Sequence, residues 1–381
     1  MNIKELTKEL VAIPSYVDGS VNEKAVADYI YAYLKRKTKL IVTKEVVEDD
    51  RYNVIAYTPN CLTGDTTFTV DTLFINHIDT VEPKQGSLRD QFVGIEEEGR
   101  LYGLGSVDTK GNVAVLMKLA ELVKDQACMF LFYVDEEYHF KGIRTFIDDY
   151  STKLKVEKII SADGENLQIR NASRGVFEVD IVYTGKTGHA SNQANGINVI
   201  HAFNRICYGL EKSLEQKGAD NLGKSTLNVA YVYAGLNRGE KDTEKLLGRS
   251  GNNIPDYLEA TLEFRMNTQV EGKYLLSLLK KLAKKENVTL ASITVKHAMD
   301  AWYSPKDTLL FIEKALASNN VPIAYTNPGF SGYVDIGLLK EAFPSICCCI
   351  GAKGENRHGV NEYVEIASLI TVLEVLKKVI Q

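Results

Sequence analysis

The stretch DTLFINHID, residues 71–79, decides the fold, because an apolar strand pattern in it ends on a histidine and an aspartate. A similar apolar run, CMFLFYV, fills residues 128–134, and the helical segment GNVAVLMKLAELVKD, residues 111–125, lies between the two. Short apolar runs that alternate with segments of period 3.6 are typical of a largely parallel sheet covered by helices. The same pattern predicts further strands at 52–58 and 156–162 and further helices at 2–13 and 21–37. The chain is therefore predicted to have an α/β fold.

The pattern changes between residues 175 and 300. There the order strand, helix, strand, strand, helix, strand is that of a ferredoxin-like unit. The segments are 177–185, 198–216, 225–235, 256–267, 273–285 and 291–298. After it the chain returns to helix, apolar strand and helix. We therefore expect one domain of residues 1–174 and 301–381, with a mostly parallel sheet, interrupted by a small α+β domain at 175–300.

Composition narrows the class of function. The 381 residues are 45% apolar and 25% charged, as in an ordinary globular protein of about two domains. The net charge of −5 is not segregated, which argues against nucleic-acid binding. Neither a bilayer-length apolar run nor a secretory pattern in MNIKELTKEL is present, so a cytoplasmic location is expected. The six cysteines lack metal-binding spacing and are expected to be buried apolar residues.

Five separated stretches carry side chains that bind divalent metals. The candidate ligands are His77, Asp108, Glu137, Asp163 and His358. Two imidazoles and three carboxylates suit a pair of cations if one carboxylate bridges them. Glu136, next to Glu137, stands where a general base is needed, and Asp79 can accept the second ring proton of His77. Two divalent cations, three carboxylates and a bridging hydroxide also sum to zero charge.

Each stretch alone has a structural interpretation. His77 could be a structural histidine at a strand end, and Asp108 could cap the helix that follows it. Asp135, Glu136 and Glu137 together could form a solvated turn, although three acids after a buried strand repel one another unless cations compensate. The occurrence of all five stretches in one chain favours the metal site.

The chain resembles the zinc-dependent aminoacylase and carboxypeptidase family that includes acetylornithine deacetylase and succinyl-diaminopimelate desuccinylase. The resemblance runs end to end. It rests on NHIDTVEP, GLGSVDTKGNVAVL, YVDEEYHFKG and RHGVNEYVEIASL, and on the inserted motifs TGKTGHAS and GNNIPDYLEATLEFR. By this resemblance the first domain is catalytic and metal-binding, and the insertion is a lid and dimerisation domain.

The resemblance also implies roles for single residues. His77 and Asp163 would hold one metal and Glu137 and His358 the other, with Asp108 bridging and a cis peptide after it. Glu136 would be the general base, and Asp79 would be the partner of His77.

In the insertion, His189 would stabilise the oxyanion, in many members across a dimer of lids. Arg265 would bind the substrate carboxylate, with Asn253 also lining the substrate site. Without the resemblance, His189 could cap a helix and Arg265 could form a surface pair.

Three departures from the family pattern concern the substrate side. Asp163-Gly164-Glu165 replaces Glu-Pro-Thr, so Glu165 could take the place of Asp163. A usual tryptophan is absent after the first motif, and a usual Ser/Thr-Asp pair reads Val334-Asp335.

The predicted function is hydrolysis of the amide bond of an N-acyl amino acid by two divalent ions, zinc or alternatively cobalt or manganese. An exopeptidase or dipeptidase of the same fold is the nearer alternative, and a non-catalytic metal-binding protein the more distant one. The expected partners are an N-acyl amino acid or short peptide and a second copy of the chain.

Overall fold

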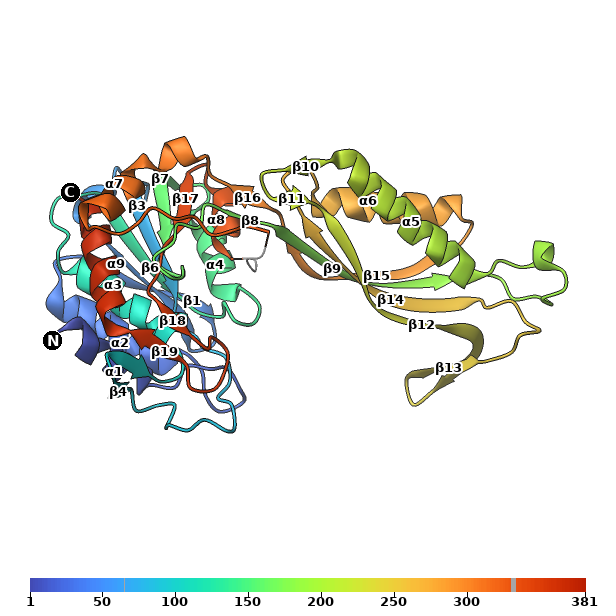
Figure 1. Cartoon of the computed structure of the whole chain (residues 1–381), viewed down its shortest axis with the longest axis horizontal. Coiled ribbons are helices and arrows are strands. Elements are labelled where there is room, and N and C mark those ends of the chain that lie inside the picture. The colour runs from blue at the N-terminus through green and yellow to red at the C-terminus, as the bar shows by residue number, and fades with distance from the viewer. Residues whose placement is uncertain (65, 330–333) are drawn as a thin grey trace. The chain divides into compact units, whose positions relative to one another are not determined.

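A computed structural model describes residues 1–64, 66–329 and 334–381 of the chain (Figure 1). The chain divides into two compact units. Unit 1 comprises residues 1–171, 304–327 and 334–381, and unit 2 comprises residues 172–303 with Pro328 and Gly329. Within the described ranges, no helix combines the length and the apolar character needed to cross a bilayer.

The centre of unit 1 is a sheet in which the described residues form six strands, in the order β1-β2-β6-β3-β7-β17. Their bounds are β1 Ile41–Glu48, β2 Arg51–Tyr57, β6 Cys128–Tyr133, β3 Phe68–His77, β7 Leu154–Ser161 and β17 Ile346–Cys349. The four strands from β6 to β17 are parallel, whereas β1 and β2 pair antiparallel at one edge. Every residue of β6 is buried, as expected of a strand covered on both faces. The predicted mostly parallel α/β sheet is confirmed.

Helices cover this sheet on both sides (Figure 1). Their bounds are α1 Ile3–Val11, α2 Lys24–Lys37, α3 Gly111–Ala120, α4 Lys141–Tyr150, α7 Leu310–Ser318, α8 Ile336–Ala342 and α9 Ile366–Val379. The helix α3 packs against α1, α2 and α9, while α4 and α8 pack together on the other side. The helix α3 ends at Ala120, five residues before the predicted end at residue 125.

A second, small antiparallel sheet in unit 1 has the order β18-β19-β5-β4. Its bounds are β4 Ile95–Glu97, β5 Arg100–Tyr102, β18 Gly354–Glu355 and β19 Tyr363–Glu365. It joins segments more than 250 residues apart, because Leu101 pairs with Val364. The segments that carry Asp108 and His358 both adjoin this sheet in the sequence.

The largest sheet of unit 2 is antiparallel, with the order β13-β12-β14-β9-β15. Two short antiparallel pairs accompany it, β8 Ala172–Ser173 with β16 Trp302–Tyr303 and β10 Ala219–Asp220 with β11 Gly223–Lys224. The bounds are β9 Gly175–Thr184, α5 Val199–Lys217, β12 Thr226–Lys241, β13 Glu244–Gly248, β14 Tyr257–Met266, α6 Gly272–Lys285 and β15 Thr289–Met299. Apart from the β13 hairpin, this is the ferredoxin-like order. The buried residues of α5, α6, β9 and β14 form its apolar core. The predicted ferredoxin-like α+β unit is confirmed.

Candidate metal centre

Three neighbouring parallel strands bring candidate ligands to one edge of the unit 1 sheet. His77 is the last residue of β3, Glu137 follows β6, and Asp163 follows β7. Since β6, β3 and β7 are adjacent and parallel, their carboxyl ends lie side by side, where open α/β sheets place their sites. Asp108 comes from the segment before α3, where its peptide bond to Thr109 is cis, as the resemblance implied.

Asp108 lies at the middle of this cluster. Its Oδ1 is 3.3 Å from Nε2 of His77, and its Oδ2 is 3.2 Å from Nε2 of His358. The same His358 nitrogen is 3.1 Å from Oε1 of Glu137. One ligand atom each from His77, Asp108 and Glu137 lies within 4.8 Å of the others. Imidazole nitrogens and carboxylate oxygens at this spacing are the donors that zinc and similar ions use.

The donor set also has unfilled bonding capacity. Oε1 of Glu137 is buried and accepts no hydrogen bond from the described residues, although His358 lies beside it. Buried polar atoms normally have a partner, and a cation would provide one here. These residues therefore fit a metal.

Asp163 is connected to the cluster through the guanidinium of Arg357, a residue that the motifs did not predict. Nη1 of Arg357 lies 3.4 Å from Oδ1 of Asp163 and 3.9 Å from Oδ2 of Asp108. Its Nη2 donates to the carbonyl oxygen of Gly164 at 2.6 Å. Glu165, the alternative carboxylate, instead accepts from Nη2 of Arg170 at 3.3 Å. Of the two acids, Asp163 is therefore the one that pairs with the same guanidinium as Asp108.

Asp79 links two of the candidate ligands. Its Oδ1 lies 3.3 Å from Nδ1 of His77, and its Oδ2 accepts from the backbone N–H of Glu137 at 2.9 Å. Both His77 and Asp79 are buried. A carboxylate in this position fixes the orientation of a ligating imidazole.

The carboxylates change the proton affinity of both imidazoles. Burial opposes the charged form of His77, but Asp108 and Asp79 outweigh it, so its pKa is raised well above the ordinary value. The carboxylates of Asp108 and Glu137, which lie beside its Nε2, raise the pKa of His358 to about 10. Burial would raise the pKa of Asp108, yet His358 and His77 hold it well below its usual range. The cluster thus strongly favours bound positive charge.

Glu136 lies in a setting suited to proton transfer. The side chain is half-buried, and burial raises its pKa well above the ordinary value. The nearby charges of Asp335 and Asp163 raise it further, while His77 opposes them. Asp335 is itself buried, which raises its pKa to about 7. A carboxylate with a raised pKa is a stronger base near neutral pH than an exposed one.

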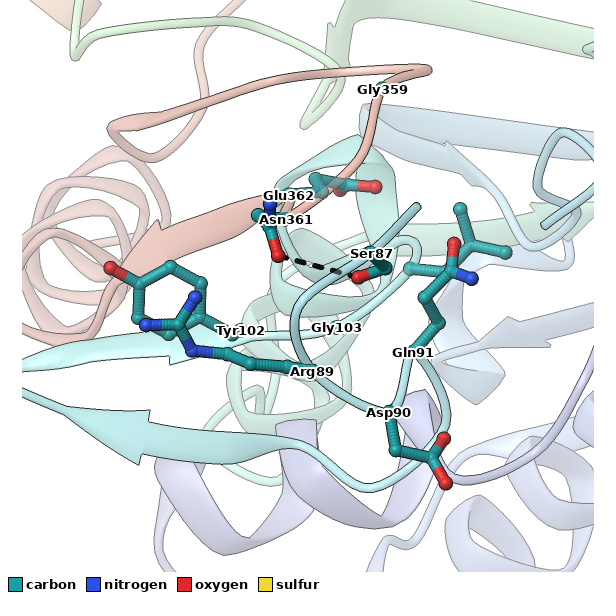
Figure 2. A pocket seen from close by; sticks show the side chains of 10 residues that line it. Ser87, Arg89, Asp90, Gln91, Tyr102, Gly103, Gly359, Asn361 and Glu362 are labelled. Atoms are coloured by element: carbon teal, nitrogen blue, oxygen red, sulfur yellow. Dashed lines mark hydrogen bonds between the residues drawn. The ribbon is translucent and has the colours of Figure 1, made fainter. Parts of the chain in front are cut away.

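Glu362, to which the motifs gave no role, holds the segment that presents Asp108. Its buried carboxylate accepts three backbone N–H groups, from Gly105 at 2.8 Å and from Val107 and Asp108 at 2.9 Å. Asn361 beside it accepts from the Ser87 hydroxyl at 3.4 Å, as Figure 2 shows. Only its place in the sequence pointed to Glu362, because it follows the candidate ligand His358 by four residues in RHGVNE.

Arg51 holds the turn that carries Glu136. Its Nη2 lies 2.6 Å from Oδ1 of Asp135 and 2.6 Å from Oε1 of the buried Glu23. Its Nε donates to the other Glu23 oxygen at 2.8 Å. The charge of Asp135, the first of the three consecutive acids, is therefore compensated by an arginine. No local pattern linked Arg51 to a position 84 residues away.

Unit 2 brings two of its three candidate residues together. The backbones of His189 and Asn253 pair in an isolated antiparallel bridge beyond the ends of β9 and β14. Both side chains are exposed, and Nδ1 of His189 is 2.7 Å from Oγ of Ser191. Arg265 lies near the other end of β14, where its Nε donates to Glu263 at 2.8 Å. The eight residue steps along β14 from Tyr257 to Arg265 correspond to roughly 26 Å.

Comparison with known proteins identifies the family of this chain. The sequence profile of Peptidase family M20/M25/M40 matches residues 73–381. The chain belongs to this family. The resemblance inferred from the motifs is thereby confirmed.

Two relatives of similar sequence differ in the activity that their names give. An acetylornithine deacetylase from Buchnera aphidicola subsp. Schizaphis graminum is 28% identical over 246 residues, which cover 61% of this chain and 62% of that protein. A probable carboxypeptidase from Aspergillus clavatus is 28% identical over 289 residues, covering 71% and 64%. The match to the deacetylase thus spans about three-fifths of that relative's length.

Solved M20 structures share the fold over the whole chain. An M20 family metallo-carboxypeptidase from Sulfolobus solfataricus aligns with a TM-score of 0.74 at 18% identity, covering 100% of this chain and 99% of that one. The Bacillus subtilis YXEP protein, described as a dinuclear metal binding peptidase, aligns with a TM-score of 0.65 at 16% identity, covering 99% and 96%. At these identities the likeness concerns the fold.

Proposed function

We propose that the chain is a dinuclear metal-dependent hydrolase that cleaves the amide bond of an N-acyl amino acid. The convergence of His77, His358 and Glu137 on the single carboxylate of Asp108 carries this proposal. His77 and Asp163 would hold one ion and Glu137 and His358 the other, with Asp108 shared. Zinc suits this donor set, and cobalt and manganese are the alternatives. When bound, the ions would polarise the scissile carbonyl and lower the pKa of the attacking water.

The protein's own groups would move the protons. Glu136 would accept the proton of the attacking water and then deliver it to the departing amine. The raised pKa of Glu136 supports this role, because a base that returns its proton must hold it near neutral pH. Asp79 would keep Nδ1 of His77 protonated and the ring fixed.

His189 and Asn253 would act on the substrate of a partner copy, and Arg265 would bind a substrate carboxylate. The geometry inside unit 2 supports this division, because roughly 26 Å of strand separates Tyr257, near the bridge between His189 and Asn253, from Arg265. A substrate as small as an N-acyl amino acid cannot touch both ends of one strand. A homodimer would let the two ends serve different sites.

The edge of unit 2 supports a homodimer. Residues 226–235 of β12 pair with β14 on one side, whereas β13 pairs only with residues 236–241. On the other side of β12, residues 226–235 pair with no strand of the part of the chain that the structure describes, and they expose Val229, Tyr231, Val232 and Tyr233. An open apolar edge strand is a template for pairing with another chain, so we assign it to the second copy.

An exopeptidase is the second candidate. It is favoured by the carboxypeptidases from Aspergillus clavatus and Sulfolobus solfataricus among the similar proteins. A panel of N-acetyl amino acids and dipeptides, assayed with the zinc- and cobalt-reconstituted full chain, separates the two. Faster turnover of N-acyl amino acids supports the deacylase, and faster turnover of dipeptides supports the peptidase.

The variant Glu136→Ala tests the shared chemistry. We expect it to bind two metals like the wild type, because Glu137 keeps the ligand role, and to lose about 100-fold to 10,000-fold in kcat. Metal content by plasma mass spectrometry and turnover on the preferred substrate are the two readouts. Wild-type kcat in this variant would remove Glu136 from the mechanism. Two bound metals without turnover on any substrate, in the wild type, would instead favour a non-catalytic metal-binding protein.

A further inference from the structure

Arg357 lies in the metal centre but has no part in the proposed chemistry. It immediately precedes His358, and its guanidinium lies among the carboxylates of the cluster. Nη1 is 3.4 Å from Asp163 and 3.9 Å from Asp108, both of which are candidate ligands. The charges of Asp108 and Asp163 outweigh the effect of burial and raise the pKa of Arg357 above its ordinary value. The positive charge is therefore permanent.

The guanidinium is also held in place. Its Nη2 donates to the carbonyl oxygen of Gly164 at 2.6 Å. Gly164 in turn is packed against the backbone of Ile350 and Gly351, so closely that a Cβ on it would lie 2.4 Å from the carbonyl carbon of Ile350. The Arg357 guanidinium is therefore bound to a carbonyl group whose position is fixed by packing.

A fixed positive charge affects the two metal positions unequally. A cation that uses Asp163 must share that carboxylate with the guanidinium. A cation held by Glu137 and His358 shares with Arg357 only the more distant contact to Asp108. Coulomb repulsion between like charges a few ångströms apart exceeds thermal energy several-fold even at an effective dielectric constant of about 20.

We propose that Arg357 sets the order in which the two metal positions fill. It competes with the cation for Asp163, so the position of Glu137, His358 and Asp108 fills first. The position of His77 and Asp163 fills second and more weakly. This inference rests on the proposed dinuclear centre, but it concerns metal affinity and not turnover.

Two substitutions separate charge from shape. Arg357→Gln removes the charge and keeps a donor for the Gly164 carbonyl, whereas Arg357→Lys keeps the charge. Arg89→Met is the matched control. The Cζ atom of Arg89 lies 3.9 Å from the centroid of the Tyr102 ring (Figure 2), and its ion pair is with Glu97, which is not a candidate ligand. Circular dichroism checks that each variant folds, and Arg357→Met is a second neutral variant if Arg357→Gln does not.

The measurement is a zinc titration of chelator-treated full-length protein by calorimetry against a competing chelator. We expect two unequal sites in the wild type, in Arg357→Lys and in Arg89→Met. In the neutral variant the weaker site should tighten by roughly tenfold or more, while the tighter site changes less.

Two results would overturn the inference. An unchanged weaker site would mean that the charge of Arg357 does not reach it. A weakened site in Arg357→Gln would mean that the arginine orients Asp163 for the metal and does not compete with it. If the wild type binds no zinc at all, the proposed metal centre itself fails, which this titration distinguishes from a failure of the ordering.

Discussion

Arg51→Met is expected to destabilise unit 1 severely, because the arginine pairs with two buried acids. Glu23 is fully buried and Asp135 is 1% exposed. Arg51 makes two hydrogen bonds to Glu23 and one to Asp135, at 2.6–2.8 Å. Removing one partner of a buried ion pair typically costs about 3–5 kcal/mol, since the remaining charge is left without compensation.

The loss can be measured as a change in thermal unfolding. Unit 1 has about 240 residues, and for a domain of that size each kcal/mol shifts Tm by about 2–4 °C. We therefore expect Arg51→Met to lower Tm by about 6–20 °C, as followed by circular dichroism. Catalytic activity measured below that Tm should also fall, because the turn that carries Glu136 follows Asp135 directly.

Lys141→Met provides the matched control for this experiment. Nζ of Lys141 binds the Glu48 carboxylate at 2.6 Å, and the Arg51 Nη1 contacts the same carboxylate at 3.2 Å, but Lys141 and Glu48 are both exposed. Exposed pairs contribute only about 0–1 kcal/mol, so this variant should melt close to the wild type. An Arg51→Met protein that also melts within about 2 °C of the wild type would refute the idea that Asp135 depends on Arg51.

Three further predictions concern the pH dependence of stability, the role of His189 in unit 2, and the choice between Asp163 and Glu165 as metal ligand. Burial raises the pKa of Glu45 to about 7, so the folded state keeps a proton that the unfolded state releases near its ordinary pKa of about 4.3. Stability should therefore fall as pH rises from about 4.3 to about 7. Glu45→Gln should remove this slope and be more stable than wild type by up to about 3 kcal/mol at pH 8, and urea denaturation at pH 4 and pH 8 decides. His189→Ala should lower kcat by about 100-fold, and mixing it with Glu136→Ala should restore activity in hybrid dimers; an additive mixture argues against a contribution from the partner copy. Asp163→Ala should bind one zinc and Glu165→Ala two, and the reverse stoichiometry would make Glu165 the ligand.

The location of the site could be predicted from the sequence because it depends on a local rule. Each of His77, Glu137 and Asp163 stands at or just after the end of an apolar strand, and parallel neighbours place those ends together. Polar side-chain contacts between segments that are distant in the sequence follow no such rule. Glu362 binds backbone groups more than 250 residues away, and Arg51 reaches Asp135 across 84 residues. Polar contacts of this kind leave no periodic pattern in the chain.

Some elements were missed because their composition hides them. The strand β1, with the sequence IVTKEVVE, and the helix α4, with KGIRTFIDDY, are partly exposed and mix charged with apolar residues. The strand β12 continues to Lys241 through the polar stretch LNRGEK, beyond the predicted end at residue 235. A polar strand at the edge of a sheet can form its backbone hydrogen bonds without burying its side chains. Hydrophobic patterning therefore does not reveal such a strand.

The three consecutive acids after β6 show why residue type alone could not assign their roles. In a continuing strand, Asp135 and Glu137 would point to one face and Glu136 to the other. Instead β6 ends at Tyr133, and Asp135 adopts a left-handed conformation with φ of 70°. Its side chain then meets Arg51, while Oε1 of Glu137 lies 3.1 Å from His358. Glu136 is left without an arginine, and burial raises its pKa. One turn thus places a neutralised acid, a candidate base and a candidate ligand side by side, and it does so because Arg51 removes the first charge from the cluster.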